Sequence, residues 1–302
     1  MNTISKGRVA GIVAGLGFFL LAQTLPLFSE AATIKTIATE RSAGGAFEIE
    51  VRVITDEHSV NAVEGVLQIP DGVTDIQVST AGSAFPVFAA GPVYEIGDRS
   101  ISFTAGAPGG IKEGSEGLVF SVYGKAQSVG SYTFEMSSAR AYRNDGEGTA
   151  ENVSKTPTSI QVERIDTPPK NLALENIQSD TIKPNITVEI GRDNSLFEGN
   201  YFLAFYGSDV GSGISYFEVS EGWRDFGTIK DFYILKDQKL GSVIRVRAYD
   251  EAGNATISYV WPEHPLAHAP YYGALVLIGV ALFSMFLWLR KRHDLRNAEA
   301  RV

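Results

Sequence analysis

The segment Arg245–Asn254, with the sequence RVRAYDEAGN, places three oxygen-bearing side chains close together. Asp250, Glu251 and Asn254 could ligate a hard cation, because Ca²⁺ prefers carboxylate and amide oxygens. Two neighbouring carboxylates could also serve as an acid–base pair. A third interpretation is a tight turn in which Asp and Asn bond to their own backbone.

The residues on either side of this segment favour the turn. Apolar residues alternate with Arg245 and Arg247, which predicts a strand that ends near Tyr249. A second strand pattern, ATISYVW, begins directly after Asn254. Two strands joined through Gly-Asn predict a hairpin. Nothing nearby in the sequence supplies a base partner or further metal ligands.

The sequence lacks the common catalytic motifs, and we therefore predict that the chain is not an enzyme. It contains no cysteine, which excludes disulfides, thiol catalysis and thiolate-bound metals. The motifs Gly-x-Ser-x-Gly and His-Glu-x-x-His do not occur in it, nor does a phosphate-binding loop. His264 and His268 have a helical spacing, but prolines flank them and argue against a helical metal site. A pair of glycosidase carboxylates stays open, although small sandwiches offer little room for a deep cleft.

The N-terminal residues 1–31 have the pattern of a secretory signal. Lys6 and Arg8 precede the apolar run Val9–Phe28, and Ser29-Glu30-Ala31 fits a cleavage site with small residues. The run is long for a signal, so an uncleaved membrane anchor is the alternative.

Residues 271–289 near the C-terminus contain no charge and are long enough to span a bilayer as a helix. The tail, residues 290–302, begins with Arg-Lys-Arg and is predicted to be cytoplasmic, because positively charged flanks stay inside. We therefore expect a single-pass protein of the cell membrane with the ectodomain outside. The net charge of the chain is −9, and the ectodomain is strongly acidic with no run of basic residues, which argues against a nucleic-acid partner.

The ectodomain is predicted to be all-β. Short stretches of alternating apolar and polar residues, such as AFEIEVRVIT, are separated by Gly, Asn, Asp and Pro, which predicts a β-sandwich over residues 32–164. A Pro-rich linker at 165–170 follows, and its two prolines favour a semi-stiff extended segment. Six or seven shorter strands then predict an immunoglobulin-like sandwich over 171–262. Residues 263–270 are predicted to form a neck above the membrane.

Three segments make the first domain resemble a cohesin: NAVEGVLQIPDGV, GLVFSVYGKA and ARAYRNDGEGTAENV. The resemblance implies a nine-stranded jelly-roll sandwich, related to carbohydrate-binding modules, that binds dockerin modules through one sheet face. It carries over no interface residue, since these vary between types. The second domain resembles the bacterial Ig-like repeats of surface proteins, through SDVGSGISYFEV and RVRAYDEAGNAT.

Two groups of residues in the first domain are candidate sites. Asn144, Asp145 and Glu147 could supply oxygen ligands to calcium, or could form a Gly-rich turn capped by its own side chains. No other cofactor is expected.

Phe85, Phe88 and Tyr94 are candidates for stacking on sugar rings. Their alternative role is to pack a long loop onto the sandwich.

The expected function is that of a membrane-anchored surface protein whose head binds a dockerin-like or other protein partner, with the second domain as a spacer. Polysaccharide binding and a purely structural stalk or adhesin are the alternatives.

Overall fold

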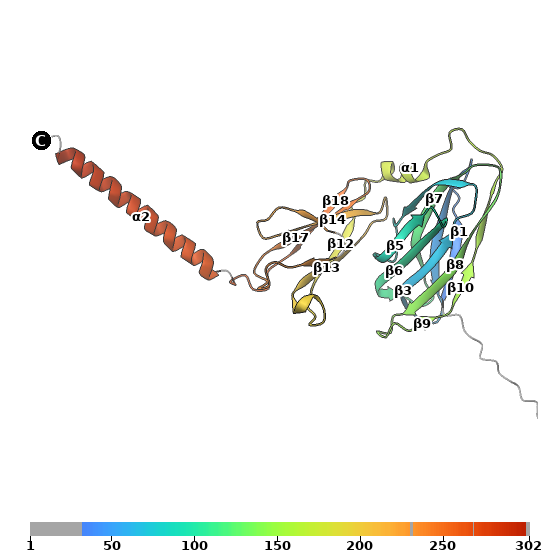
Figure 1. Cartoon of the computed structure of the whole chain (residues 1–302), viewed down its shortest axis with the longest axis horizontal. Helices are drawn as coiled ribbons and strands as arrows, with labels where there is room; N and C mark the ends of the chain where they lie inside the picture. Colours follow the sequence, from blue (N-terminus) through green and yellow to red (C-terminus); the bar gives the residue numbers. More distant parts are fainter. Residues whose placement is uncertain (1–31, 230–231, 268, 300–302) are drawn as a thin grey trace, which may run out of the picture.

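The computed structural model of the protein describes residues 32–229, 232–267 and 269–299. Two β-sandwiches follow one another along the chain, and a long helix follows the second (Figure 1). The predicted all-β ectodomain with a C-terminal helix is therefore confirmed. The predicted signal helix, residues 1–31, lies outside the described residues.

The first sandwich consists of two sheets packed face to face. The five-stranded sheet has the order β10-β1-β2-β7-β4. Its strands are β1 (Ala32–Ala38), β2 (Ala46–Thr55), β4 (Val73–Ser79), β7 (Glu116–Ala126) and β10 (Val153–Thr156). The other sheet has the order β11-β8-β3-β6-β5, with β9 paired to β8. Its strands are β3 (Val60–Gln68), β5 (Val87–Glu95), β6 (Ser100–Ile111), β8 (Gly130–Arg143), β9 (Ala150–Glu151) and β11 (Thr158–Val162).

This sandwich has eleven strand segments, where the cohesin resemblance implied nine. One of the extra segments, β9, is only two residues long. Another arises at Pro157, which separates β10 from β11. Strand β10 pairs in parallel with β1 in one sheet, and β11 pairs antiparallel with β8 in the other. Proline has no N–H to donate to a ladder, so the chain changes sheets at this residue.

Aromatic side chains fill the space between the two sheets. Phe47 and Phe120 from the five-stranded sheet meet Phe134 and Phe103 from the other, with ring centroids 5.1 and 5.0 Å apart. All four rings are buried. Burial of each ring stabilises the fold by roughly 1.5–3 kcal/mol, because its apolar surface is removed from water. The inward residues of the alternating strands thus form one continuous core.

A helix follows the Pro-rich linker where the sequence analysis placed the start of the second sandwich. Helix α1 spans Leu172–Ser179, and the side chain of Asn171 caps it by accepting the N–H of Leu174 at 3.0 Å. Leu172 and Ala173 are buried against Ala46 and Tyr123 of the first sandwich. The segment after the linker is therefore a helix docked onto the first domain, and the first strand of the second sandwich begins only at Asn185.

The second sandwich has seven strands in two sheets, as expected for an immunoglobulin-like domain. One sheet has the order β12-β13-β16 and the other β15-β14-β17-β18. The strands are β12 (Asn185–Gly191), β13 (Phe202–Ser208), β14 (Ile214–Glu221), β15 (Gly227–Ile229), β16 (Phe232–Ile234), β17 (Ile244–Asp250) and β18 (Ala255–Val260), and the 3-10 turn η1 (Phe197–Gly199) precedes β13. β17 and β18 form the hairpin predicted at RVRAYDEAGN.

Helix α2 runs from Ala269 to Glu299. Its segment Tyr272–Arg290 has a mean hydropathy of 2.2 and none of it is buried in the protein, so by length and composition it could cross a membrane. This agrees with the span predicted at 271–289. The helix begins at Ala269, inside the predicted neck.

Candidate functional site

The outer face of the six-stranded sheet presents small, mostly uncharged side chains. Buried and exposed residues alternate along β6 and β8, so every second side chain points to solvent. Its outward residues include Val66, Ser102, Thr104, Thr133, Ser137 and Ser159, together with the charged Glu64, Glu135 and Arg140. A flat surface of this kind can be buried against a partner with little cost for desolvating charges.

A shallow hollow of about 300 Å³ lies on this face, where β3, β6 and β8 run side by side. Glu64 and Arg140 lie on its border, with 3.5 Å between the nearest carboxylate oxygen and guanidinium nitrogen. The Tyr142 hydroxyl donates to the same Glu64 oxygen at 2.8 Å. The face thus combines a hollow lined mostly by small neutral residues with one ion pair, Glu64–Arg140, at its border.

The outer face of the five-stranded sheet is highly charged. Glu116 accepts hydrogen bonds from Lys35 at 2.9 Å and Arg52 at 3.3 Å, and Arg52 also binds Glu50. The hydrogen bond from Lys35 holds the pKa of Glu116 below its usual value, against the opposing effect of burial. These side chains satisfy one another within the sheet.

Helix α1 packs on part of that face, against β2 and β7, through a partly buried polar cluster. The Tyr123 hydroxyl donates to Glu48 Oε1 at 2.9 Å and accepts from Asn176 Nδ2 of the helix at 2.7 Å. Arg41 lies 3.4 Å from Glu48 Oε2 and donates to Asn176 Oδ1 at 2.6 Å. Burial, together with the charge of Glu48, raises the pKa of Tyr123 well above its usual value, so the phenol stays neutral and remains a donor.

The three aromatic residues predicted to stack on sugars do not form an exposed row. Phe85 is completely buried in the core, so its ring cannot meet a sugar, and the prediction is wrong for this residue. Phe88 and Tyr94 lie on β5 and are half-buried against the same core. Their apolar surface is used to pack β5 and the preceding loop onto the sandwich.

The predicted calcium loop has the geometry of a turn. Asp145 Oδ1 accepts the N–H groups of Glu147 and Gly148 at 2.9 and 3.0 Å. Asn144 Nδ2 donates to the carbonyl of Gly109 at 3.0 Å. The one group of three acidic side chains that closes around a common point in the described residues lies elsewhere. The contacts of Asn144, Asp145 and Glu147 therefore favour the capped turn.

The segment RVRAYDEAGN forms the predicted turn and also contributes to a cluster that the sequence analysis missed. Asp250 Oδ1 accepts the N–H of Asn254 at 2.7 Å. Two residues distant in sequence, Asp180 and Asp209, bring carboxylate oxygens within 4.8 Å of that of Asp250 and of each other. The available signal was the Asp before Ser-Gly-Ile in SDVGSGI, which was assigned only to the Ig-like pattern.

Comparison with known proteins finds similar solved structures among cohesins. No family model matches the chain. No curated protein matches it. A non-cellulosomal cohesin from Archaeoglobus fulgidus is 16% identical with a TM-score of 0.34, and the match covers 45% of this chain and 93% of that one. The seventh ScaB type I cohesin from Pseudobacteroides cellulosolvens is 15% identical with a TM-score of 0.37, and covers 46% and 97%. The third ScaB cohesin from R. flavefaciens, solved in complex with a group 1 dockerin, is 16% identical with a TM-score of 0.36, and covers 46% and 99%. At such identities and TM-scores, the function of this chain has to be inferred from its own residues.

Replacing Tyr123 with Phe is expected to lower the free energy of unfolding of the first sandwich by about 1–3 kcal/mol, because buried Glu48 and half-buried Asn176 each lose a hydrogen-bond partner. The raised pKa of Tyr123 adds a pH dependence. The unfolded phenol ionises near its ordinary value of 10.0 while the folded one does not, so stability is full below that pH and falls as the pH rises above it. The variant should show a weaker fall. Denaturant unfolding of the full chain from neutral to strongly alkaline pH measures both effects.

Tyr259→Phe is the matched control, since this ring is 53% exposed in the second sandwich. An equal decrease in the free energy of unfolding in the two variants would contradict the assigned role of Tyr123.

Asp145→Ala is expected to speed amide exchange at Glu147 and Gly148, because their acceptor is removed. Hydrogen bonds from the Thr149 hydroxyl and then from the loop amides lower the pKa of Asp145 to about 2. The lowered pKa means that the carboxylate protects the loop above its ordinary value of 3.8, and that this protection is lost as the pH falls through about 2. The difference in amide exchange rate between wild type and variant should therefore shrink as the pH falls from 3.8 to about 2, as measured by hydrogen exchange with mass spectrometry. Glu147→Gln serves as the control, and faster exchange in that variant alone would refute the assignment.

Proposed function

We propose that this chain is a membrane-anchored surface protein whose first sandwich binds a protein partner of the dockerin kind. The outer face of the six-stranded sheet is the binding surface in this proposal, and the second sandwich holds it away from the bilayer. Helix α2 is the anchor, with the ectodomain outside the cell and the basic tail in the cytoplasm.

The observation that carries the proposal is the difference between the two outer faces of the first sandwich. One face is satisfied internally by ion pairs and is partly covered by α1 through Tyr123 and Leu172. The other presents Ser102, Thr104 and Val66 around a hollow. A sheet face whose polar groups are small and whose backbone is already paired can accept a flat partner without large rearrangement.

The ion pair at the border of the hollow gives this face its orientation and specificity. Glu64 is held by both Arg140 and Tyr142, so its carboxylate has a fixed direction. A partner that offers a cation toward Glu64 or a carboxylate toward Arg140 would bind in one register. The neutral residues in between would supply packing, which is the usual arrangement of an interface with a few strong contacts.

An arginine placed on the face tests the proposal. The full chain in lipid nanodiscs is immobilised, and binding of a panel of dockerin modules is measured by surface plasmon resonance. Ser102→Arg should weaken binding by about tenfold or more, because a bulky charge then stands in the centre of the interface. The matched control is Ser154→Arg on β10 of the opposite sheet, which should bind as the wild type does.

Equal binding by the two variants would move the interface away from the six-stranded sheet. If no dockerin module binds the wild type, the proposed partner class is wrong. A parallel glycan array distinguishes the alternative: glycan binding that is sensitive to Ser102→Arg would make this face a polysaccharide site instead.

A further inference from the structure

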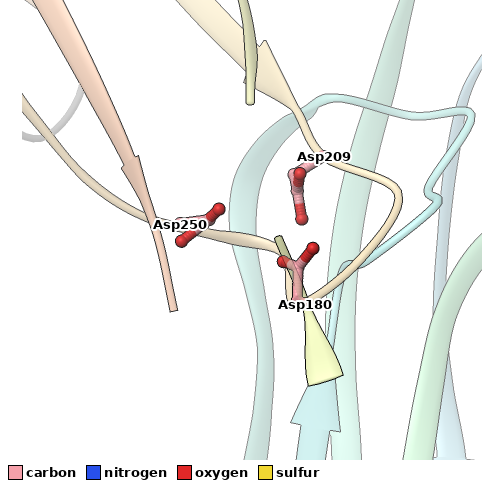
Figure 2. A group of neighbouring side chains, drawn as sticks. All are labelled: Asp180, Asp209 and Asp250. Atoms are coloured by element: carbon pink, nitrogen blue, oxygen red, sulfur yellow. The ribbon is translucent and has the colours of Figure 1, made fainter. Parts of the chain in front are cut away.

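Three aspartates meet where the second sandwich faces the first. Asp180 follows helix α1, Asp209 follows β13, and Asp250 ends β17. Each offers a carboxylate oxygen within 4.8 Å of the other two. Figure 2 shows the carboxyl group of Asp209 directed toward that of Asp180, with Asp250 to their left. Asp209 is 3% exposed and Asp250 is 2% exposed, so two of the three negative charges are almost completely removed from bulk water.

Neutral donors hold the three carboxylates in place. Asp209 Oδ2 accepts the N–H groups of Gly211, Ser212 and Gly213 at 2.8–3.0 Å. Asp180 Oδ2 accepts the Ser212 hydroxyl at 2.6 Å. Within the described ranges, no Lys, Arg or His forms an ion pair with any of the three aspartates. Like charges this close in a buried position repel one another unless a cation neutralises them.

One oxygen of the cluster has no partner. Asp209 Oδ1 is fully shielded from solvent and receives no hydrogen bond from the part of the chain that the structure describes. Leaving a buried anionic oxygen unpaired is unfavourable, because it has lost its water and gained nothing in return. The donors on Oδ2 fix the carboxyl group, so Oδ1 cannot turn away to find a partner elsewhere. Asp209 Oδ1 is thus a buried, unpaired oxygen in a carboxyl group that lies beside two further carboxylates, and such an oxygen is a suitable ligand for a hard cation.

We propose that Asp180, Asp209 and Asp250 bind one calcium ion at the junction of the two sandwiches. The donors are hard carboxylate oxygens, with no sulfur or imidazole among them, which favours Ca²⁺ over transition metals. Calcium accepts six to eight oxygen ligands in irregular geometry, so solvent can complete the shell beside the half-buried Asp180. Magnesium demands a more regular octahedron and fits less well.

The ion would fix how the two domains sit against each other. Asp180 belongs to the segment that α1 ties to the first sandwich. The loop that starts at Asp209 touches the same sandwich directly, since the N–H of Gly82 donates to the Asp209 carbonyl at 2.6 Å. Gly211 lets Asp180 lie close to this loop, because a Cβ at position 211 would come within 2.1 Å of Asp180 Oδ1. Calcium thereby joins a segment held by the first domain to two loops of the second.

The test is calorimetric titration of CaCl₂ into the full chain in detergent after treatment with EDTA. The wild type should bind one Ca²⁺ with high affinity relative to Mg²⁺. Asp209→Asn and Asp180→Asn keep the size of the side chain and should each weaken that binding at least about tenfold, because one charged ligand is lost. Asp193→Asn is the matched control, since Asp193 caps its own exposed turn at Ser195 and should bind as the wild type does.

Circular dichroism separates loss of a ligand from loss of the fold, and Asp180→Asn provides a second reading if Asp209→Asn does not fold. No heat of binding in the wild type at millimolar calcium would overturn the proposal. Unchanged affinity in a folded Asp180→Asn or Asp209→Asn variant would overturn it too. Neither outcome depends on whether a dockerin binds the first sandwich.

A distance measurement tests the structural consequence. The chain has no cysteine, so Asp98→Cys in the first domain and Asn194→Cys in the second can be spin-labelled cleanly. Calcium should narrow the distribution of distances between the two labels, and the added Asp209→Asn change should abolish the narrowing. If the chain binds calcium but the distribution of label distances does not change, the ion does not affect domain orientation and this consequence is refuted.

Discussion

The buried hydrogen-bond chain from Glu48 through Tyr123 to Asn176 is the contact on which the arrangement of this ectodomain depends. A carboxylate inside a protein must be paired, and here the first sandwich supplies the phenol while helix α1 supplies the amide. The pairing docks the helix, and the docked helix covers part of one sheet face. The end of the same helix places Asp180 beside the second sandwich.

The two sheets of the first sandwich are thereby given different roles. The charged side chains of the five-stranded sheet form ion pairs with one another, such as Lys35–Glu116, and helix α1 packs on this sheet. The six-stranded sheet keeps small side chains outside and aromatic ones inside, so it is stable without anything on its outer surface. The outer surface across β3, β6 and β8 is therefore the face that we propose for binding a partner.

The junction concentrates acidic groups where the two domains meet. Asp209 serves two neighbours at once: its carbonyl accepts from Gly82 of the first sandwich, and its carboxylate is held by the loop of the second. Repulsion among Asp180, Asp209 and Asp250 works against closing this junction, so a cation that neutralises it acts on domain orientation directly. The proposed recognition at the head and the proposed calcium site at the junction thus involve different residues, and helix α1 lies between them.

The sequence by itself determined the features that depend on near neighbours. Alternation defined the strands, Gly253-Asn254 defined the hairpin, and an uncharged run defined the possible membrane span. It could not determine contacts between residues far apart, because these depend on how finished elements dock. Three features became visible only in the tertiary structure. Phe85 is buried, and α1 packs on the first sandwich. Asp250 lies in a cluster with Asp180 and Asp209 as well as in its turn. The physical reason is that periodicity assigns a side chain to one face of a strand, whereas the packing of sheets and loops decides what that face meets.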